Sequence, residues 1–253
     1  MDLSAFSLAG KTIMITGANT GIGQGIALSV ARAGARVIGV GRSSMDQTAA
    51  AVREQGVDFI PVQADLGDTA AARNMFEAVW SEHGPVDGLV NNAGIIKRVD
   101  AVDFTEDDWD SVMDINLKTM FFLAQSLGRK AIGSDRPAKI VNIASMLSFQ
   151  GGIRVASYTA SKSGVLGITR LLANEWAVRS INVNAIAPGY IETNNTEALR
   201  ADPDRSASIL ARIPAGRWGA PSDIGDAAVF LLSNASNYMH GAVIPVDGGW
   251  LAR

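Results

Sequence analysis

A tyrosine and a lysine four residues apart, Tyr158 and Lys162, are the residues of this sequence best suited to acid–base chemistry. On a helix, that spacing places them one turn apart on the same face. A free phenol has a pKa near ~10, and an ammonium ~4 Å away, at an effective dielectric constant of ~20, favours the phenolate by ~4 kcal/mol. We therefore expect Lys162 to bring the pKa of Tyr158 toward the range useful for general acid–base catalysis. The alternative is a surface helix whose lysine extends into solvent, because this spacing also arises by chance.

A glycine-rich segment follows the first predicted strand, residues 11–16, and precedes a helical stretch that ends near residue 33. Glycines let the backbone approach a pyrophosphate, and free N–H groups at the start of a helix favour an anion. The spacing G-x-x-x-G-x-G differs from the common G-x-G-x-x-G fingerprint. A tight turn is the alternative, but the position at the start of a βαβ unit favours a dinucleotide site. Its predicted residues are Gly17, Asn19, Thr20, Gly21, Ile22 and Gly23.

The end of the second predicted strand, residues 36–40, bears on the choice between NAD and NADP. An acidic residue there would bind the ribose hydroxyls and select NAD, but the sequence has Gly41 and Arg42 instead. Arg42 could face the 2′-phosphate of NADP, or it could be an exposed loop residue. The third predicted strand, residues 59–63, places Asp65 where an adenine amino group can be met, with Leu66 beside it.

Three later strand ends carry further candidate residues, because ligands bind at the carboxyl ends of strands in an open parallel sheet. The fourth predicted strand, residues 88–90, runs into a turn of amides and small residues, and the fifth, residues 139–143, precedes a serine. The sixth, residues 181–187, ends at a Pro-Gly pair. The candidates are Asn92, Ala93 and Gly94, then Ser145, then Pro188, Gly189, Ile191 and Thr193. Asn116 stands among apolar residues of a predicted helix, either as a satisfied core group or as a functional one.

Composition and charge restrict the class of protein. The 253 residues are 47% hydrophobic and 19% charged, which is typical of a compact α/β domain. A net charge of −3 gives no reason to expect nucleic acid or an anionic membrane as a partner. No apolar run approaches the ~20 residues of a membrane span, and the first residues lack a signal-peptide charge pattern, so we expect a cytoplasmic protein. The absence of cysteine excludes disulfides, thiolate nucleophiles and Cys-ligated zinc, and we expect no metal.

Predicted strands and helices alternate along the whole chain without a linker. This alternation predicts a single α/β domain, residues 1–253, with a Rossmann-type doubly wound parallel sheet of about seven strands and helices on both faces. Residues 190–213, rich in Asn, Arg and Ala, are the predicted substrate lid.

Taken together, these motifs resemble the short-chain dehydrogenase/reductase family. They are Thr16-Gly17-x-x-x-Gly21-x-Gly23, Asn91-Asn92-Ala93-Gly94, Ser145, Tyr158-x-x-x-Lys162 and Pro188-Gly189, in this order. The resemblance implies that Tyr158 is the acid or base, and that Lys162 holds the nicotinamide ribose and lowers the pKa of the phenol. It implies that Ser145 orients the reacting oxygen and that Asn116 fixes a water in the proton relay. Thr193 would meet the nicotinamide carboxamide.

Longer stretches, among them IPAGRWGAPSD and VDGGWLAR, resemble family members that act on deoxy sugar acids. That resemblance implies an NAD-linked, reversible ketone–alcohol conversion in pectin degradation, carried out by a cytoplasmic homotetramer, with NADP possible in view of Arg42. One alternative is reduction of 3-oxoacyl groups on acyl carrier protein, or of another polyol or ketone. A non-catalytic dinucleotide-binding sensor is a second alternative, against which the complete tetrad argues.

A sugar-acid substrate presents a carboxylate, which a cation at a fixed distance from Tyr158 would bind. Arginine suits a carboxylate better than lysine because its planar fork can bind both oxygens. We expect Arg154 first and Arg98 second, with Lys97 as a further candidate and with Asn194 and Asn195 as partners of substrate hydroxyls. Each of these cations could instead be a solvated loop residue.

Overall fold

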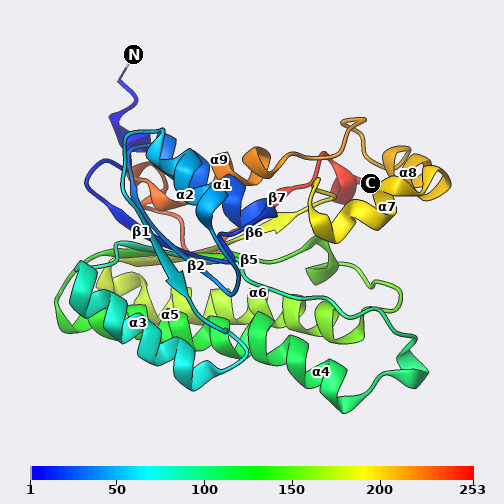
Figure 1. The fold of residues 1–253 in the computed structure, drawn as a ribbon, viewed down its shortest axis with the longest axis horizontal. Helices are drawn as coiled ribbons and strands as arrows, with labels where there is room; N and C mark the ends of the chain where they lie inside the picture. Colours follow the sequence, from blue (N-terminus) through cyan, green and yellow to red (C-terminus); the bar gives the residue numbers. More distant parts are fainter. Residues whose placement is uncertain (1) are drawn as a thin grey trace.

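The computed structural model describes residues 2–253 and contains a seven-stranded sheet in which every pairing is parallel (Figure 1). The strand order is β3-β2-β1-β4-β5-β6-β7. The strands are β1 (Thr12–Thr16), β2 (Arg36–Gly41), β3 (Phe59–Gln63), β4 (Gly88–Asn91), β5 (Ala138–Ile143), β6 (Ile181–Pro188) and β7 (Val243–Val246). The predicted doubly wound sheet is confirmed, and the strand bounds differ from the prediction by one residue at most.

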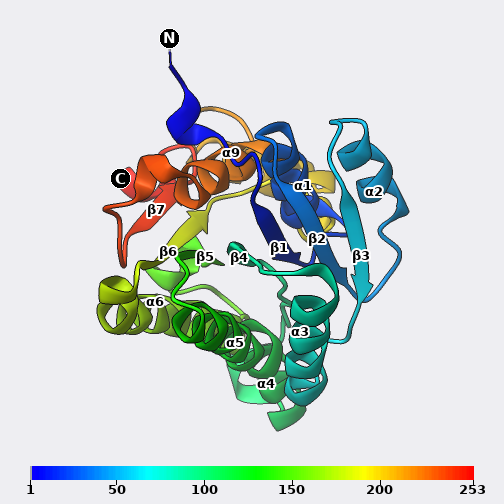
Figure 2. The same cartoon turned by 90° about the vertical axis from the view of Figure 1, so that its left-hand side faces the viewer.

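Helices cover both faces of the sheet (Figure 2). One face carries α1 (Gly21–Arg32), α2 (Asp46–Arg53) and α9 (Pro221–Leu232), and the other carries α3 (Thr69–His83), α4 (Glu106–Met113), α5 (Met120–Gly133) and α6 (Ala156–Trp176). The central strands β1, β4, β5 and β6 are buried along their whole length. A parallel sheet covered by helices on both faces has no side toward solvent, which explains the continuous apolar runs in the sequences of these strands.

The chain order reverses around β1, which pairs with β2 on one side and β4 on the other. Connections that leave neighbouring strands in opposite directions open a crevice at their carboxyl ends. The fold therefore provides a ligand site between the start of α1 and the ends of β4 and β5.

Four helical features were not predicted from the sequence. These are α2, the short helices α7 (Glu197–Ala201) and α8 (Pro203–Leu210), and a π-helical turn at Asp114–Thr119 that joins α4 to α5. The start of α4 is capped by a side chain, because the Thr105 Oγ1 accepts a hydrogen bond of 3.1 Å from the Asp108 N–H.

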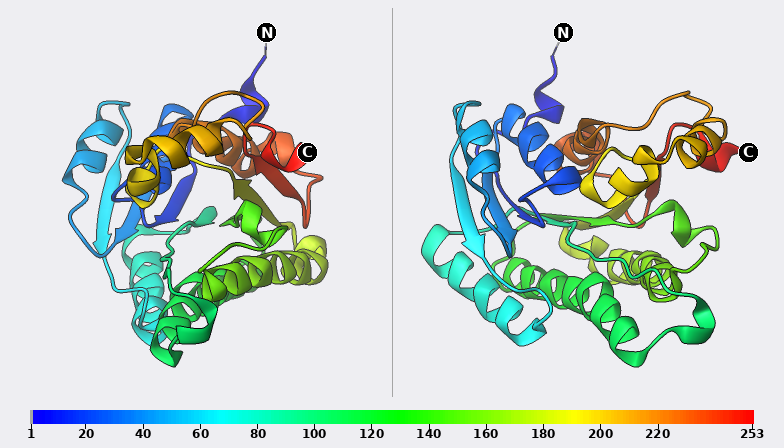
Figure 3. Two further views of the ribbon diagram at one scale, coloured as in Figure 1. Left: turned by 90° about the vertical axis from the view of Figure 1, so that its right-hand side faces the viewer. Right: turned by 45° about the vertical axis from the view of Figure 1, so that its right-hand side comes forward.

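The predicted lid segment, residues 190–213, contains α7 and α8, which lie beside the C-terminus and apart from the two helical layers (Figure 3). Side chains of this segment pack with residues from elsewhere in the chain in a small apolar cluster. Its buried members are Met146, Ile209, Ile213, Trp218 and Trp250. Within residues 2–253, no helix has the length and apolar character needed to cross a membrane.

Candidate active site

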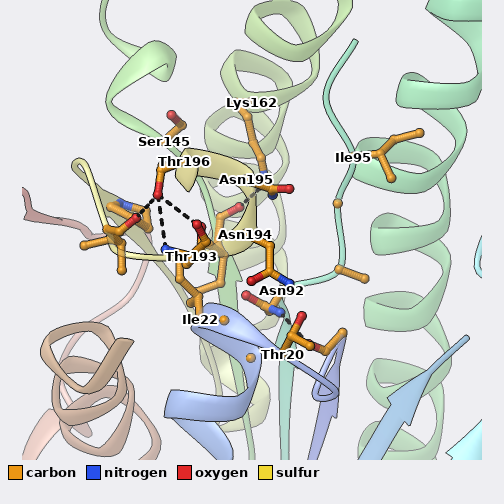
Figure 4. A pocket seen from close by; sticks show the side chains of 18 of the residues that line it. Thr20, Ile22, Asn92, Ile95, Ser145, Lys162, Thr193, Asn194, Asn195 and Thr196 are labelled. Atoms are coloured by element: carbon orange, nitrogen blue, oxygen red, sulfur yellow. Dashed lines mark hydrogen bonds between the residues drawn. The ribbon is translucent and has the colours of Figure 1, made fainter. Parts of the chain in front are cut away.

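A cavity of about 460 Å³ lies at the carboxyl ends of the strands (Figure 4). It is lined by most of the predicted cofactor residues, namely Gly17, Asn19, Thr20, Gly21, Ile22, Gly23, Arg42, Asn92, Ala93, Gly94, Tyr158, Lys162, Pro188, Gly189, Ile191 and Thr193. Ser145, Asn194 and Asn195 also line it. A cavity of this size is typical of a small-molecule or cofactor site.

Four lining residues were missed by the sequence reasoning: Ile95, Ile143, Ala144 and Thr196. Ile143 and Ala144 directly precede Ser145, so their place at a strand end could have been inferred. The position of Thr196 could not be inferred from the sequence, because this residue reaches the cavity only through the turn that its own hydroxyl stabilises. That hydroxyl lies 2.7 Å from the Ile191 carbonyl and 3.0 Å from the Thr193 carbonyl, and accepts from the Thr193 N–H (Figure 4).

The glycine-rich loop is built for close backbone approach. Gly17 has φ +68°, and a Cβ there would lie 2.9 Å from the Asn92 Nδ2. A Cβ on Gly23 would run into the Gly17 carbonyl. The loop therefore presents backbone rather than side chains to the cavity, as a pyrophosphate at the start of α1 requires.

The turn after β4 is fixed to the end of β1. The Thr16 hydroxyl accepts hydrogen bonds of 3.0 Å from the N–H groups of both Asn92 and Ala93, and Asn92 Nδ2 donates to the Thr16 carbonyl at 2.8 Å. The neighbouring Asn91 Nδ2 donates to Asn142 Oδ1 at 2.9 Å, so asparagine does brace adjacent strands here. These bonds form one wall of the cavity.

Tyr158 and Lys162 lie on α6 as their spacing predicted, and both line the cavity. The Lys162 ammonium is buried and donates a 2.6 Å hydrogen bond to the Ile143 carbonyl at the end of β5. Ser145 follows that strand end directly and lines the same cavity. Three groups suited to proton transfer and hydrogen bonding of a carbonyl oxygen thus meet at one place.

Comparison with known proteins agrees with this geometry. A family model described as enoyl-(acyl carrier protein) reductase matches residues 17–251. The chain belongs to the short-chain dehydrogenase/reductase family. Like the other members of this family, it is an NAD(P)-dependent oxidoreductase.

Individual relatives are similar over nearly the whole chain. The 2-dehydro-3-deoxy-D-gluconate 5-dehydrogenase of Dickeya dadantii is 56% identical over all 253 residues and is itself covered completely. A proposed 2-deoxy-D-gluconate 3-dehydrogenase from Agrobacterium tumefaciens, solved with bound NADP, is 56% identical with a TM-score of 0.94, covering 98% of this chain and 99% of that one. A proposed NAD(P)-dependent gluconate 5-dehydrogenase from Beutenbergia cavernae, with NADP at low occupancy, is 50% identical with a TM-score of 0.95, covering 98% and 100%.

The electrostatics of this reductase site differ from the expectation at one point. Burial raises the pKa of Tyr158 above its ordinary value, while hydrogen bonding with Ser145 and the positive charge of Arg98 act in the opposite direction. Burial also lowers the pKa of Lys162 to about 8. The predicted lowering of the phenol pKa by Lys162 is therefore wrong for the protein alone. The effect of burial on the phenol exceeds those of Ser145 and Arg98, and the Lys162 ammonium donates its hydrogen bond to the Ile143 carbonyl. At neutral pH the phenol holds its proton and is ready to donate it.

Asn116 is a buried and satisfied group in the π-helical turn. Its Oδ1 accepts from the Ile95 N–H at 2.9 Å, and its Nδ2 donates to the Ile95 carbonyl at 3.0 Å and to Ser161 Oγ at 3.3 Å. Asn116 does not line the cavity but fixes Ile95, which does. Its role in a water relay stays a prediction.

Asp65 and Leu66 lie outside the cavity lining. An oxygen of the Asp65 carboxylate accepts the Gly67 N–H at 2.9 Å, and the Leu66 side chain is buried in the core. Both residues follow β3, which pairs with β2, the strand that ends next to the cavity-lining Arg42. Their predicted contact with the adenine stays a prediction.

Two of the three cations predicted for the substrate carboxylate are already paired and do not line the cavity. Arg154 Nε lies 3.0 Å from Asp100 Oδ1, and Lys97 Nζ lies 3.1 Å from Asp108 Oδ1. Arg98 has no carboxylate within ion-pair distance among residues 2–253. These ion pairs favour Arg98 over Arg154 as the partner of a substrate carboxylate, and the order expected from the sequence stays a prediction.

Arg98 does not line the cavity either, but it contacts a residue that does. Its Nη2 is 3.4 Å from the carbonyl of Asn195, which lines the cavity, and its charge reaches the Tyr158 phenol. In the part of the chain that the structure covers, no three His, Cys, Asp or Glu residues gather as a metal site.

Proposed function

We propose that this protein interconverts a ketone and a secondary alcohol on a deoxy sugar acid, as a 2-dehydro-3-deoxy-D-gluconate 5-dehydrogenase. The observation that carries the proposal is that Tyr158 and Ser145 line one cavity, while Arg98 contacts the cavity-lining Asn195 and has no carboxylate within ion-pair distance in residues 2–253. The first two suit a carbonyl oxygen and the third suits a carboxylate. The names of the relatives from Dickeya dadantii and Agrobacterium tumefaciens support the same substrate class.

The roles of the side chains follow from their positions. The nicotinamide of the bound cofactor supplies hydride transfer chemistry. Tyr158 donates its proton to the substrate oxygen in reduction and takes it back in oxidation, and Ser145 Oγ binds the same oxygen. Lys162 lines the cavity, with its ammonium bonded to the Ile143 carbonyl, and would bind the ribose of the cofactor. Residues 190–213, which include the cavity-lining Asn194 and Asn195, form the proposed lid.

The choice between NAD and NADP depends on the end of β2. Arg42 lines the cavity and has no carboxylate within ion-pair distance in residues 2–253. This leaves its guanidinium available for a 2′-phosphate. We therefore propose that the enzyme accepts NADP at least as readily as NAD.

Gly41→Asp should shift this preference toward NAD. The new carboxylate would repel the 2′-phosphate and bind ribose hydroxyls, and we expect kcat/KM with NADP to fall about tenfold relative to NAD, or ~1.4 kcal/mol. A Cβ on Gly41 would lie 3.3 Å from Asn19 Oδ1, so a small adjustment is needed for any side chain. Gly41→Ala is the matched control for size. An equal ratio of kcat/KM with NADP to kcat/KM with NAD in the wild type, Gly41→Asp and Gly41→Ala would mean that Gly41 does not face the ribose.

Cofactor binding should depend on the charge of Lys162. Burial lowers the pKa of this lysine to about 8, so it is ammonium below pH 8 and loses its charge above. Because the dinucleotide is anionic, the dissociation constant of NADPH for the free enzyme should be constant below pH 7 and rise severalfold between pH 8 and pH 9.5. Titrations followed by NADPH fluorescence measure it. Lys162→Met should bind more weakly and lose this pH dependence; an unchanged profile in the variant would assign it to another group.

The test of the proposed function is a spectrophotometric screen. NADH and NADPH oxidation are followed with a panel of keto sugar acids, neutral keto sugars and 3-oxoacyl thioesters. Fastest turnover of a keto sugar acid supports the proposal, and fastest turnover of the thioester would establish the acyl reductase alternative. Turnover of none of them, with NADPH still bound, would favour the non-catalytic sensor.

A homotetramer, a cytoplasmic location and a place in pectin degradation belong to the same proposal and rest on the family resemblance. Exposed apolar side chains on three helices, Trp109 on α4, Ile132 on α5 and Leu171 on α6, are available for burial between subunits. Light scattering after size-exclusion chromatography measures the oligomeric state.

A further inference from the structure

The C-terminal tail, residues 247–253, contacts two segments near the site: the one that follows Ser145 and the one that follows α8. Trp250 is buried, and its indole Nε1 donates a 3.0 Å hydrogen bond to Gln150 Oε1, in the segment that follows Ser145. On its other side, the Arg212 guanidinium lies 3.9 Å from the centre of the Trp250 ring, and Arg253 Nη2 donates to the Ala211 carbonyl at 2.7 Å. Residues 211 and 212 directly follow α8 of the proposed lid.

A specific turn brings this tail back onto the protein. Gly248 and Gly249 have φ values of +65° and +89°, and a Cβ on either would press against Ile213 or Pro214 at 2.8 and 3.0 Å. The Asp247 carboxylate accepts the N–H groups of Gly249 and Leu251, each at 2.9 Å. The tail is thus held in one place rather than lying loosely on the surface (Figure 3).

The contact continues to Ser145. The Gln150 N–H donates to the Met146 carbonyl at 3.2 Å, and Met146 is both the residue after Ser145 and a member of the apolar cluster with Trp250 and Ile209. A change at Trp250 therefore reaches the catalytic serine through one side-chain hydrogen bond and one turn of backbone. The Trp250 ring also lies 4.9 Å, centre to centre, from the ring of Tyr190, which stands between the cavity-lining Gly189 and Ile191. A phenylalanine at position 250 keeps a ring for this contact and removes the hydrogen bond to Gln150.

We propose that Trp250 is a positioning residue for the substrate, acting through Gln150 on the segment 145–150 and through Arg212 on α8. It touches neither substrate nor cofactor. The inference rests on the proposed function only for the choice of the ketone used in the assay. It predicts that the tail contributes to substrate recognition and leaves dinucleotide binding unchanged.

Trp250→Phe and Gln150→Met test the inference, because each removes the indole hydrogen bond while keeping an apolar side chain of similar reach. Loss of one hydrogen bond of ~1 kcal/mol should raise the KM of the ketone about fivefold in either variant. The double variant should show about the same fivefold increase rather than the product of the two, since both changes remove one interaction. The dissociation constant of NADPH should stay within about twofold of that of the wild type.

Two further measurements separate positioning from simple stabilisation. Trp80→Phe, a matched change in α3 far from the tail, should leave the KM unchanged. Hydrogen exchange of the 147–150 amides should be faster in Trp250→Phe and unchanged in Trp80→Phe, a readout that needs no substrate. Unchanged exchange and KM, additive effects in the double variant, or parallel losses of NADPH and ketone binding would overturn the inference. Absence of any turnover in the wild type would reject the proposed function alone, because the exchange experiment still decides the role of Trp250.

Discussion

Tyr158→Phe is expected to lower kcat/KM for the ketone by ~10²–10⁴-fold, the range typical of lost general acid–base assistance. The variant keeps the ring that lines the cavity and loses only the hydroxyl. Because burial raises the pKa of this phenol, its hydroxyl is the protonated group at neutral pH that can supply the proton to the substrate oxygen. The NADPH dissociation constant should change little.

Two other variants serve as comparisons for Tyr158→Phe. Tyr238→Phe is a matched control, since Tyr238 is fully exposed and should tolerate the change. Lys162→Ala should weaken both turnover and NADPH binding, because the ammonium is placed for the ribose as well as near the phenol. More than about a tenth of wild-type activity in Tyr158→Phe would show that another group transfers the proton.

The sequence was sufficient for the sheet and for most of the cavity lining. Strand ends of a doubly wound sheet fall on one edge, so residues that follow buried apolar runs converge without any knowledge of side-chain contacts. Gly17 and Ser145 follow two separate strands, and this rule brought them to one cavity. Helix spacing placed Tyr158 and Lys162 on one face of α6.

Side-chain pairing could not be predicted in the same way. The expectation for Arg154 used only its distance along the chain from Tyr158, whereas its ion pair with Asp100 depends on how two loops pack. The Lys162 ammonium was expected beside the phenol, and the carboxyl end of β5 provides the Ile143 carbonyl as its hydrogen-bond partner. Short helices such as α7 carry too few residues for an apolar period to be recognised.

The indole of Trp250 illustrates a related limit. The segment VDGGWLAR was noticed for its family resemblance, and nothing in its composition indicates that the tryptophan bonds to Gln150, 100 positions earlier in the chain. Contacts between distant segments of this kind arise from the turn at Gly248 and Gly249, which only the folded chain shows.

Arg98→Gln is expected to reduce kcat/KM for a keto sugar acid roughly 10- to 150-fold, which corresponds to the loss of a charged hydrogen bond of ~1.5–3 kcal/mol. Arg98 is the unpaired cation of the three candidates, lies against the cavity-lining Asn195, and its charge reaches Tyr158. Glutamine keeps much of the length of the side chain and can hold the Asn195 carbonyl, but it cannot form the planar charged pair with a carboxylate.

The substrate used in the assay decides whether Arg98 binds the carboxylate. A neutral ketone of similar size should lose little in Arg98→Gln, because at neutral pH Tyr158 is already protonated and does not need the added charge for reduction. Arg154→Gln serves as the matched control, since Arg154 is paired with Asp100. This variant should change kcat/KM for the acid and for the neutral ketone to the same small extent. Equal losses on the acid and the neutral ketone in Arg98→Gln would mean that Arg98 supports the lid through Asn195. A selective loss in Arg154→Gln instead would require its ion pair with Asp100 to open when the acid binds, and would restore the order that the sequence alone suggested.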